Sequence, residues 1–128
     1  MNFEFFVLYN TKLIYSNNIG RPLFSDDQRV LVVGFISALD SFSKSTMQTE
    51  LEEIKFSNSI IYFRREKSKL FVLLFPDFTQ QVNISKFFDS FIPQAIIVLE
   101  VSEVLPSKAN ESKIDDIFTS TSKVILET

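Results

Sequence analysis

Apolar positions predict five strands along the chain. FEFFVLYN (3–10) is apolar on both faces, so we expect a central strand that is covered on two sides. KLIYSN (12–17) follows Asn10-Thr11 closely enough to be its antiparallel hairpin neighbour, and NNIGRP (17–22) is a loop. Three more strands are predicted at 50–59, 60–66 and 70–75. The first carries charges typical of an exposed sheet edge, and the last is again apolar on both faces.

A helix is predicted over FSDDQRVLVVGFISALDSF (24–42). Ser25 with Gln28 fits a capping box, and Asp26 and Asp27 suit the positive end of the helix dipole. At about 100° per residue, the expected core side gathers Leu31, Val32, Phe35, Ile36, Ala38, Leu39 and Phe42. The opposite side carries Val30, Val33, Gly34, Ser37, Asp40 and Ser41. Most of these residues are small or apolar, so this side is poorly suited to water.

Gly34 sharpens this question, because glycine inside a helix costs up to about 1 kcal/mol relative to alanine. Close approach of another backbone would compensate for that cost. Two interpretations stay open. Either Gly34 lies against a loop of the same molecule, or the outer side of the helix is a contact face for another chain.

Helical spacing returns in the last third of the sequence, at Ile84, Phe87, Phe88, Phe91, Ala95 and Leu99. Pro93 predicts a kink or two abutting helices, and AIIVLEV (95–101) alone is also compatible with a strand. LPSKANES (105–112) has the composition of a loop. A last helix is expected to start at Ser112 with Asp115, and its inner side is Ile114, Ile117, Phe118, Thr121 and Ile125.

The predicted order of elements is β-β-α-β-β-β-α-α. If the two strands that are apolar on both faces lie side by side, the strand order becomes 2-1-5-4-3. We therefore expect an α+β fold, a three-layer α/β/α sandwich around a five-stranded antiparallel sheet. The first helix would cover one face and the C-terminal helices the other. At 128 residues the chain is expected to be a single domain, 1–128.

Composition limits the chemistry more than it suggests any. The sequence has no Cys and no His, and it has only two Gly, so thiolate, imidazole and Gly-rich phosphate-loop chemistry are excluded. Adjacent acidic pairs such as Asp26-Asp27 point apart on a helix or strand. The net charge of −3 without a basic block disfavours nucleic acid. The start MNFEFFVLYN does not look like a signal peptide. We expect a cytoplasmic protein that is not an enzyme and has no catalytic residues, cofactor or metal site.

The chain resembles the longin domain family of the longin and roadblock group. The resemblance is carried by FEFFVLYNTKLIYSN, IGRPLFSDDQRVLVVGFISALDSF and LEEIKFSNSIIYFRREKSKLFVLLFPD, and it covers residues 1 to about 92. A chain that begins directly with a strand is closer to longin than to roadblock. Because no coiled-coil segment follows, we expect a regulatory or scaffold subunit instead of a longin-type SNARE.

This resemblance implies a non-catalytic interaction module of membrane traffic and small-GTPase regulation. It implies a homodimer or heterodimer, with a small Ras-like GTPase or another longin or roadblock subunit as partner and at most peripheral membrane association. Such domains pair through the first helix and the third strand. Carried onto this chain, the interface residues are Val30, Val33, Gly34, Ser37, Ser41, Leu51, Glu53, Lys55 and Ser57.

One alternative is a small-molecule sensor with a Phe-lined pocket between layers. The candidate lining residues are Phe71, Phe75, Phe87, Phe88 and Phe91. A Phe-rich set without convergent polar groups is more often packed core.

Overall fold

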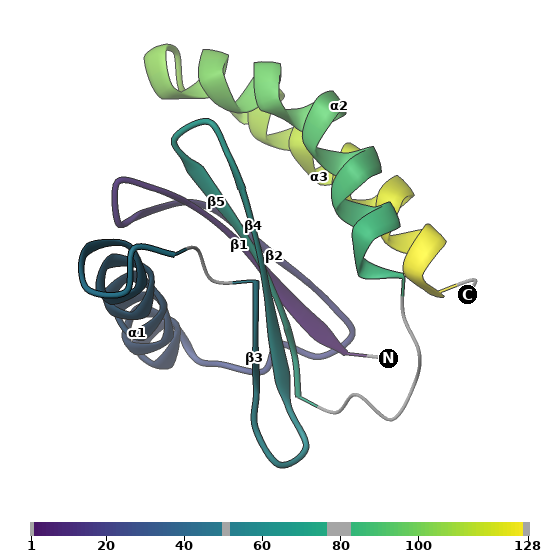
Figure 1. The fold of residues 1–128 in the computed structure, drawn as a ribbon. Helices are drawn as coiled ribbons and strands as arrows, with labels where there is room; N and C mark the ends of the chain where they lie inside the picture. Colours follow the sequence, from purple (N-terminus) through teal and green to yellow (C-terminus); the bar gives the residue numbers. More distant parts are fainter. Residues whose placement is uncertain (1, 50–51, 77–82, 127–128) are drawn as a thin grey trace. The chain divides into compact units, whose positions relative to one another are not determined.

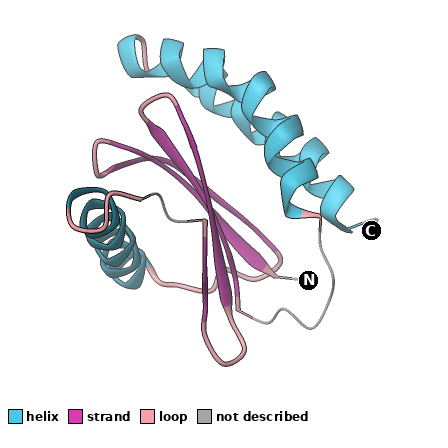
Figure 2. Ribbon diagram, in the orientation of Figure 1, coloured by secondary structure: helices cyan, strands magenta, loops and turns pink. Residues whose placement is uncertain are grey.

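The computed structural model describes residues 2–49, 52–76 and 83–126. The chain divides into two compact units, Met1–Thr79 and Gln80–Thr128, and each is described by itself. The first unit contains β1 (Phe3–Tyr9), β2 (Lys12–Ile19), α1 (Asp26–Ser45), β3 (Glu53–Lys55), β4 (Ile60–Glu66) and β5 (Lys69–Phe75). The second contains α2 (Ile84–Val104) and α3 (Lys108–Leu126). The predicted element order is therefore confirmed (Figures 1 and 2).

The five described strands form one antiparallel sheet in the order β2-β1-β5-β4-β3, which confirms the predicted order. β1 and β5, the two strands expected at the centre, pair directly, with Phe6 opposite Val72. Every described residue of β5 is buried, as the apolar pattern on both of its faces requires. β3 lies at the edge, where its charged side chains discourage pairing with other chains.

Tight turns fix the register of the two long hairpins. Asn10 and Thr11 both have positive φ, 48° and 68°, as a two-residue type I′ hairpin turn requires. The turn between β4 and β5 likewise places Lys67 at a φ of 55°. Asn10-Thr11 is therefore the connection that the sequence predicted.

Two strands differ in length from the prediction. β2 continues to Ile19, past the expected end at residue 17. The strand expected at 50–59 is only Glu53–Lys55, because the backbone turns just after it: the N–H of Phe56 donates to the carbonyl oxygen of Ser59 at 2.8 Å. The edge of the sheet is thus short.

α1 begins where the sequence predicted. The Ser25 hydroxyl accepts from the backbone N–H of Gln28 at 3.2 Å, and the Gln28 side chain accepts from the N–H of Ser25 at 2.9 Å. This capping box satisfies donors that the first turn leaves unpaired. Val33 and Ile36 of α1 then pack on one face of the sheet, in an apolar cluster with Phe6, Leu8, Ile61, Phe63, Leu70, Val72 and Leu74.

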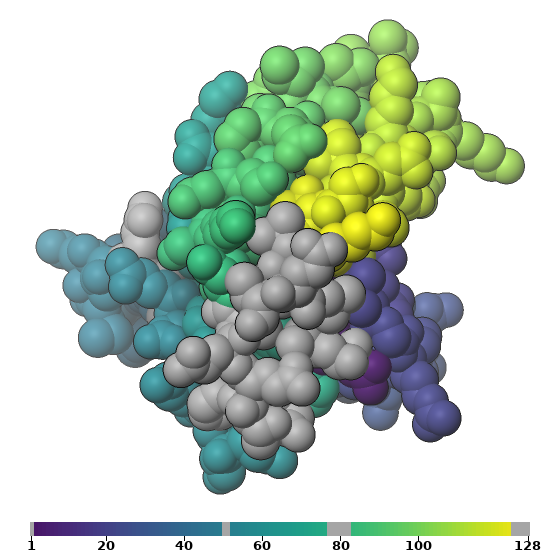
Figure 3. All heavy atoms as spheres, turned by 90° about the vertical axis from the view of Figure 1, so that its right-hand side faces the viewer, coloured from purple at the N-terminus to yellow at the C-terminus, as the bar shows by residue number. Residues whose placement is uncertain are grey.

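The second unit is a pair of helices in contact, green and yellow in Figure 3. α2 runs through Pro93 as one helix, so the predictions of two abutting helices and of a strand at 95–101 were wrong. α3 begins at Lys108, four residues before the predicted start. Ser107 caps it by accepting from the N–H of Asn110 at 3.1 Å. Of the predicted inner side of α3, Ile114, Phe118 and Thr121 are buried and Ile117 is half-buried.

Candidate interaction surface

α1 is rotated about its axis relative to the prediction. The helix buries Val33, Ile36 and Ser43, whereas Leu31 is 74% exposed and Phe35 and Phe42 are about half exposed. Ala38 is exposed as well, and Val32 and Leu39 are half-buried. The expectation that Leu31, Phe35, Ala38 and Phe42 face the core was therefore wrong, and so was the placement of Val33 and Asp40 on the outer side.

Two ion pairs explain this rotation. Arg29 contacts the fully buried Glu4 carboxylate of β1 at 3.2 Å, and Asp40 pairs with Arg65 of β4. The side chains of Arg29, Asp40 and Arg65 are at most one-fifth exposed, so these charges sit on the sheet side of the helix. Because buried charges require partners, the strands hold Arg29 and Asp40 inward. The large apolar residues of the opposite side consequently face outward.

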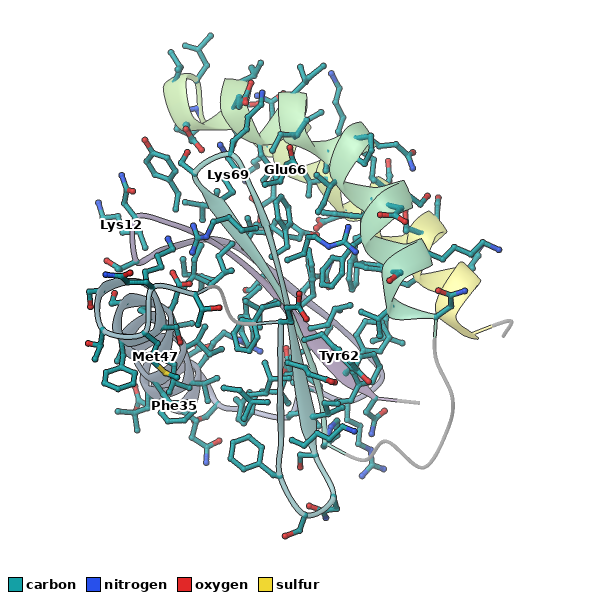
Figure 4. The ribbon with its side chains drawn as sticks, viewed as in Figure 1. Lys12, Phe35, Met47, Tyr62, Glu66 and Lys69 are labelled. Carbon is teal, nitrogen blue, oxygen red and sulfur yellow. The ribbon has the colours of Figure 1, made fainter. Side chains whose placement is uncertain are left out.

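The outward side forms a continuous apolar surface, which we call the α1 outer surface. Its members are Val30, Leu31, Gly34, Phe35, Ala38, Ser41 and Phe42. The four large apolar side chains are between half and three-quarters exposed, and so is Met47 just beyond the helix (Phe35 and Met47 are labelled in Figure 4). Single exposed apolar residues are common, but a run along one helix face indicates an interaction surface.

The predicted interface residues of α1 divide between the two sides. Val30, Gly34 and Ser41 are exposed on the α1 outer surface. Val33 is buried on the sheet side, and Ser37 is half-buried and donates to the carbonyl oxygen of Thr11 at 3.4 Å. An ideal Cβ at Gly34 would meet no described heavy atom within 4 Å outside its own helix backbone and chain neighbours. The interpretation that Gly34 lies against a loop of its own molecule is therefore wrong.

The predicted contribution of the edge strand is described only in part. Glu53, Lys55 and Ser57 are all exposed, so each is available to a partner. Leu51 lies outside the described residues. Half-buried Tyr62, directly opposite Glu53 and labelled in Figure 4, has its pKa raised first by burial and then by the negative charge of Glu53.

A polar pocket of about 160 Å³ opens beside the C-terminal half of α1. Its lining includes Thr11, Ser37, Asp40, Lys44, Arg65 and Ser68. Asp40 accepts from Arg65 and lies 3.5 Å from Lys44, so this cluster holds two positive charges and one negative charge. The flank of α1 at Lys44 is therefore positively charged overall.

The second unit exposes an apolar patch of its own near the end of α2. Ile97, Val101, Val104 and Leu105 are between 44% and 79% exposed. Spacings of three and four residues place Ile97, Val101 and Val104 on one helix face. The sequence analysis did not select these residues, because AIIVLEV was weighed as a strand.

The five Phe residues of the sensor hypothesis divide between the two units. Phe71 lies 6.5 Å from Phe5 and Phe75 lies 5.0 Å from Phe3, between ring centroids, in the first unit. In the second, Phe87 packs against Phe88, Phe91 and Phe118. Within each unit these rings fill space against one another, which is the arrangement of a packed core.

These features describe a small α+β protein with an apolar helix face turned to solvent. Comparison of the sequence with protein-family models gives no match, and comparison with curated proteins gives none either. Within residues 2–49, 52–76 and 83–126, no cluster of three acidic side chains is placed to hold a metal ion. No helix in the described part of the chain has the length and apolar character needed to cross a bilayer.

Proposed function

We propose that this protein is a longin-like, non-catalytic interaction module that dimerises and binds or regulates a small Ras-like GTPase in membrane-traffic-type processes. In this proposal it acts in the cytoplasm, at most peripherally associated with membranes. The observation that carries the proposal is the α1 outer surface, with Leu31 and Phe35 held outward by the ion pairs beneath the helix. An apolar helix face of this kind gains free energy when a partner covers it.

The fold supports the same proposal. The resemblance implied an antiparallel sheet whose edge strand lies near the first helix, and the sheet order β2-β1-β5-β4-β3 has β3 at that edge. Ile54 of β3 packs on the same apolar cluster as Val33 of α1. The helix and the edge strand therefore belong to one continuous part of the first unit, and a single partner could contact both.

The rotation of α1 revises which residues make the proposed interface. Val33 is replaced by Leu31, and the half-buried Ser37 by Phe35, Ala38 and Phe42. The exposed Glu53, Lys55 and Ser57 of the edge region remain candidates. An aromatic and aliphatic centre with a polar rim is the usual composition of a protein interface.

The test is capture of purified small GTPases, loaded with GDP or with a GTP analogue, by the immobilised protein. We expect capture of at least one GTPase by the wild type and loss of capture by Phe35→Arg. Thr119→Arg is the matched control, because Thr119 is exposed on α3 of the other unit. If no GTPase is captured in either nucleotide state, the GTPase part of the proposal fails. Capture that survives Phe35→Arg would place the contact elsewhere.

A further inference from the structure

The exposed charges of α1 have opposite signs at its two ends. Asp26 and Asp27 are exposed in the first turn, and Lys44 is exposed in the last. The apolar residues of the α1 outer surface lie between them. A partner that covers this surface therefore meets negative charge at one end of the helix and positive charge at the other.

The spacing of these charges is specific. Lys44 follows Asp26 by 18 residues, which is five helical turns and about 27 Å along the axis. Because the separation is a whole number of turns, both side chains project from the same flank of the helix. The residue midway between them is Phe35, which is half exposed on the α1 outer surface.

This arrangement is complementary to itself when one copy is reversed. A two-fold axis through the level of Phe35 would place Asp26 of one copy beside Lys44 of the other, and it would do so at both ends. A parallel pair would instead bring Asp26 close to Asp26 and Lys44 close to Lys44. The charges therefore favour the antiparallel pair and oppose the parallel one.

The apolar residues fit the same register. In an antiparallel pair centred on Phe35, Leu31 of one helix falls between Ala38 and Phe42 of the other, as a ridge enters a groove. Gly34 has open space around its Cα, and Ala38 is exposed, so the two backbones can approach closely. The positive cluster of Lys44 and Arg65 around Asp40 would lie where the Asp26 carboxylate of the second copy arrives.

We propose that the partner of the α1 outer surface is a second copy of this chain. The copy docks antiparallel across Phe35, and Asp26 of each copy pairs with Lys44 of the other. The inference rests on the proposed function, because it takes the α1 outer surface as the dimer contact. It goes further by naming the partner, the orientation and the charged pair that fixes them.

The experiment is sedimentation velocity over a wide concentration series on four full-length chains. These are the wild type, Asp26→Lys/Asp27→Lys, Lys44→Glu, and the triple variant that carries all three changes. Each partial reversal creates like-charge contacts at both ends of the dimer, so we expect its Kd to rise about tenfold or more. The triple variant restores opposite charges at both ends, so its Kd should return to within about threefold of the wild type. High salt should reduce these differences.

Thermal unfolding of the same four chains separates pairing from helix stability. Both partial reversals put charges at the wrong ends of the helix dipole, and the triple variant combines them. The triple variant should therefore unfold at the lowest temperature of the four, even though it dimerises nearly as well as the wild type. Recovery of the dimer together with loss of stability cannot come from a better-folded monomer.

The outcomes distinguish this inference from the proposed function. A wild type that stays monomeric throughout overturns the second-copy proposal, while GTPase capture still tests the partner independently. A dimer that is lost in Phe35→Arg but indifferent to the charge reversals keeps the α1 contact and overturns the register. A triple variant as weak as the partial reversals also overturns it.

Discussion

The Glu4 carboxylate and the Arg29 guanidinium lie 3.2 Å apart, although 25 residues separate them in sequence. Glu4 is fully buried in β1, and its Oε1 also accepts from the backbone N–H of Leu23 at 2.9 Å. One carboxylate thus ties the central strand to both the loop before α1 and the first turns of the helix. This contact sets the rotation of α1 and so determines which residues face solvent.

Arg29→Met is predicted to destabilise the first unit by roughly 3 kcal/mol, because it leaves a buried carboxylate without its cation. Urea unfolding followed by circular dichroism measures the change. Arg21→Met is the control, since Arg21 is exposed in the preceding loop and should change stability little. Equal stability of the two variants would mean that the Glu4–Arg29 pair does not hold the helix.

Neighbouring residues test the rotation of α1 directly. Ile36 is fully buried against the sheet and Phe35 is half exposed. Ile36→Ala should cost about 3 kcal/mol through lost burial and a cavity, whereas Phe35→Ala should change the unfolding free energy of the monomer by less than about 1 kcal/mol. Both are measured by urea unfolding at a protein concentration where the chain is monomeric. A larger loss for Phe35→Ala would restore the rotation expected from the sequence.

The strands could be predicted from the sequence because each pattern had one reading. FEFFVLYN and LFVLLF are apolar at successive positions, and only central strands bury both faces. Placing those two strands side by side fixed the rest of the sheet order. The capping box at Ser25 and Gln28 was likewise local, because its partners lie three residues apart.

The rotation of α1 could not be predicted from the helix alone. Its residues are apolar on both sides, so periodicity selects no single core face. The choice depends on Glu4 and Arg65, which lie on strands and are each 25 residues from their partners in the helix. The predicted interface therefore had the right helix and the right edge strand, but mixed outward residues such as Val30 with the inward Val33. The start of α3 was missed because Ser107 and Ser112 are both plausible caps.

Gly34→Ala is predicted to stabilise the monomer by up to about 1 kcal/mol. The position is inside α1 and the added Cβ meets only open space, so alanine gains helix propensity without a clash. Thermal unfolding at low protein concentration should show a rise of a few degrees. A fall in stability would indicate that Gly34 has a contact within its own molecule.

The last prediction concerns Tyr62, whose pKa lies above its ordinary value of about 10 because of burial and, to a smaller extent, the charge of Glu53. A raised folded-state pKa means that the folded protein holds this proton more tightly than the unfolded chain. The contribution to stability is therefore fully present below about pH 10 and is lost as pH rises through the folded-state pKa.

Glu53→Gln removes the smaller cause, so the pKa of Tyr62 should fall but stay above about 10. Ultraviolet absorbance of tyrosinate measures the titration, and the difference from Tyr62→Phe assigns it among the three tyrosines. Glu52→Gln, at an exposed neighbouring carboxylate, should shift the pKa less. If Glu53→Gln leaves the titration unchanged, the charge across the β3–β4 pair does not reach Tyr62, and burial alone sets its pKa.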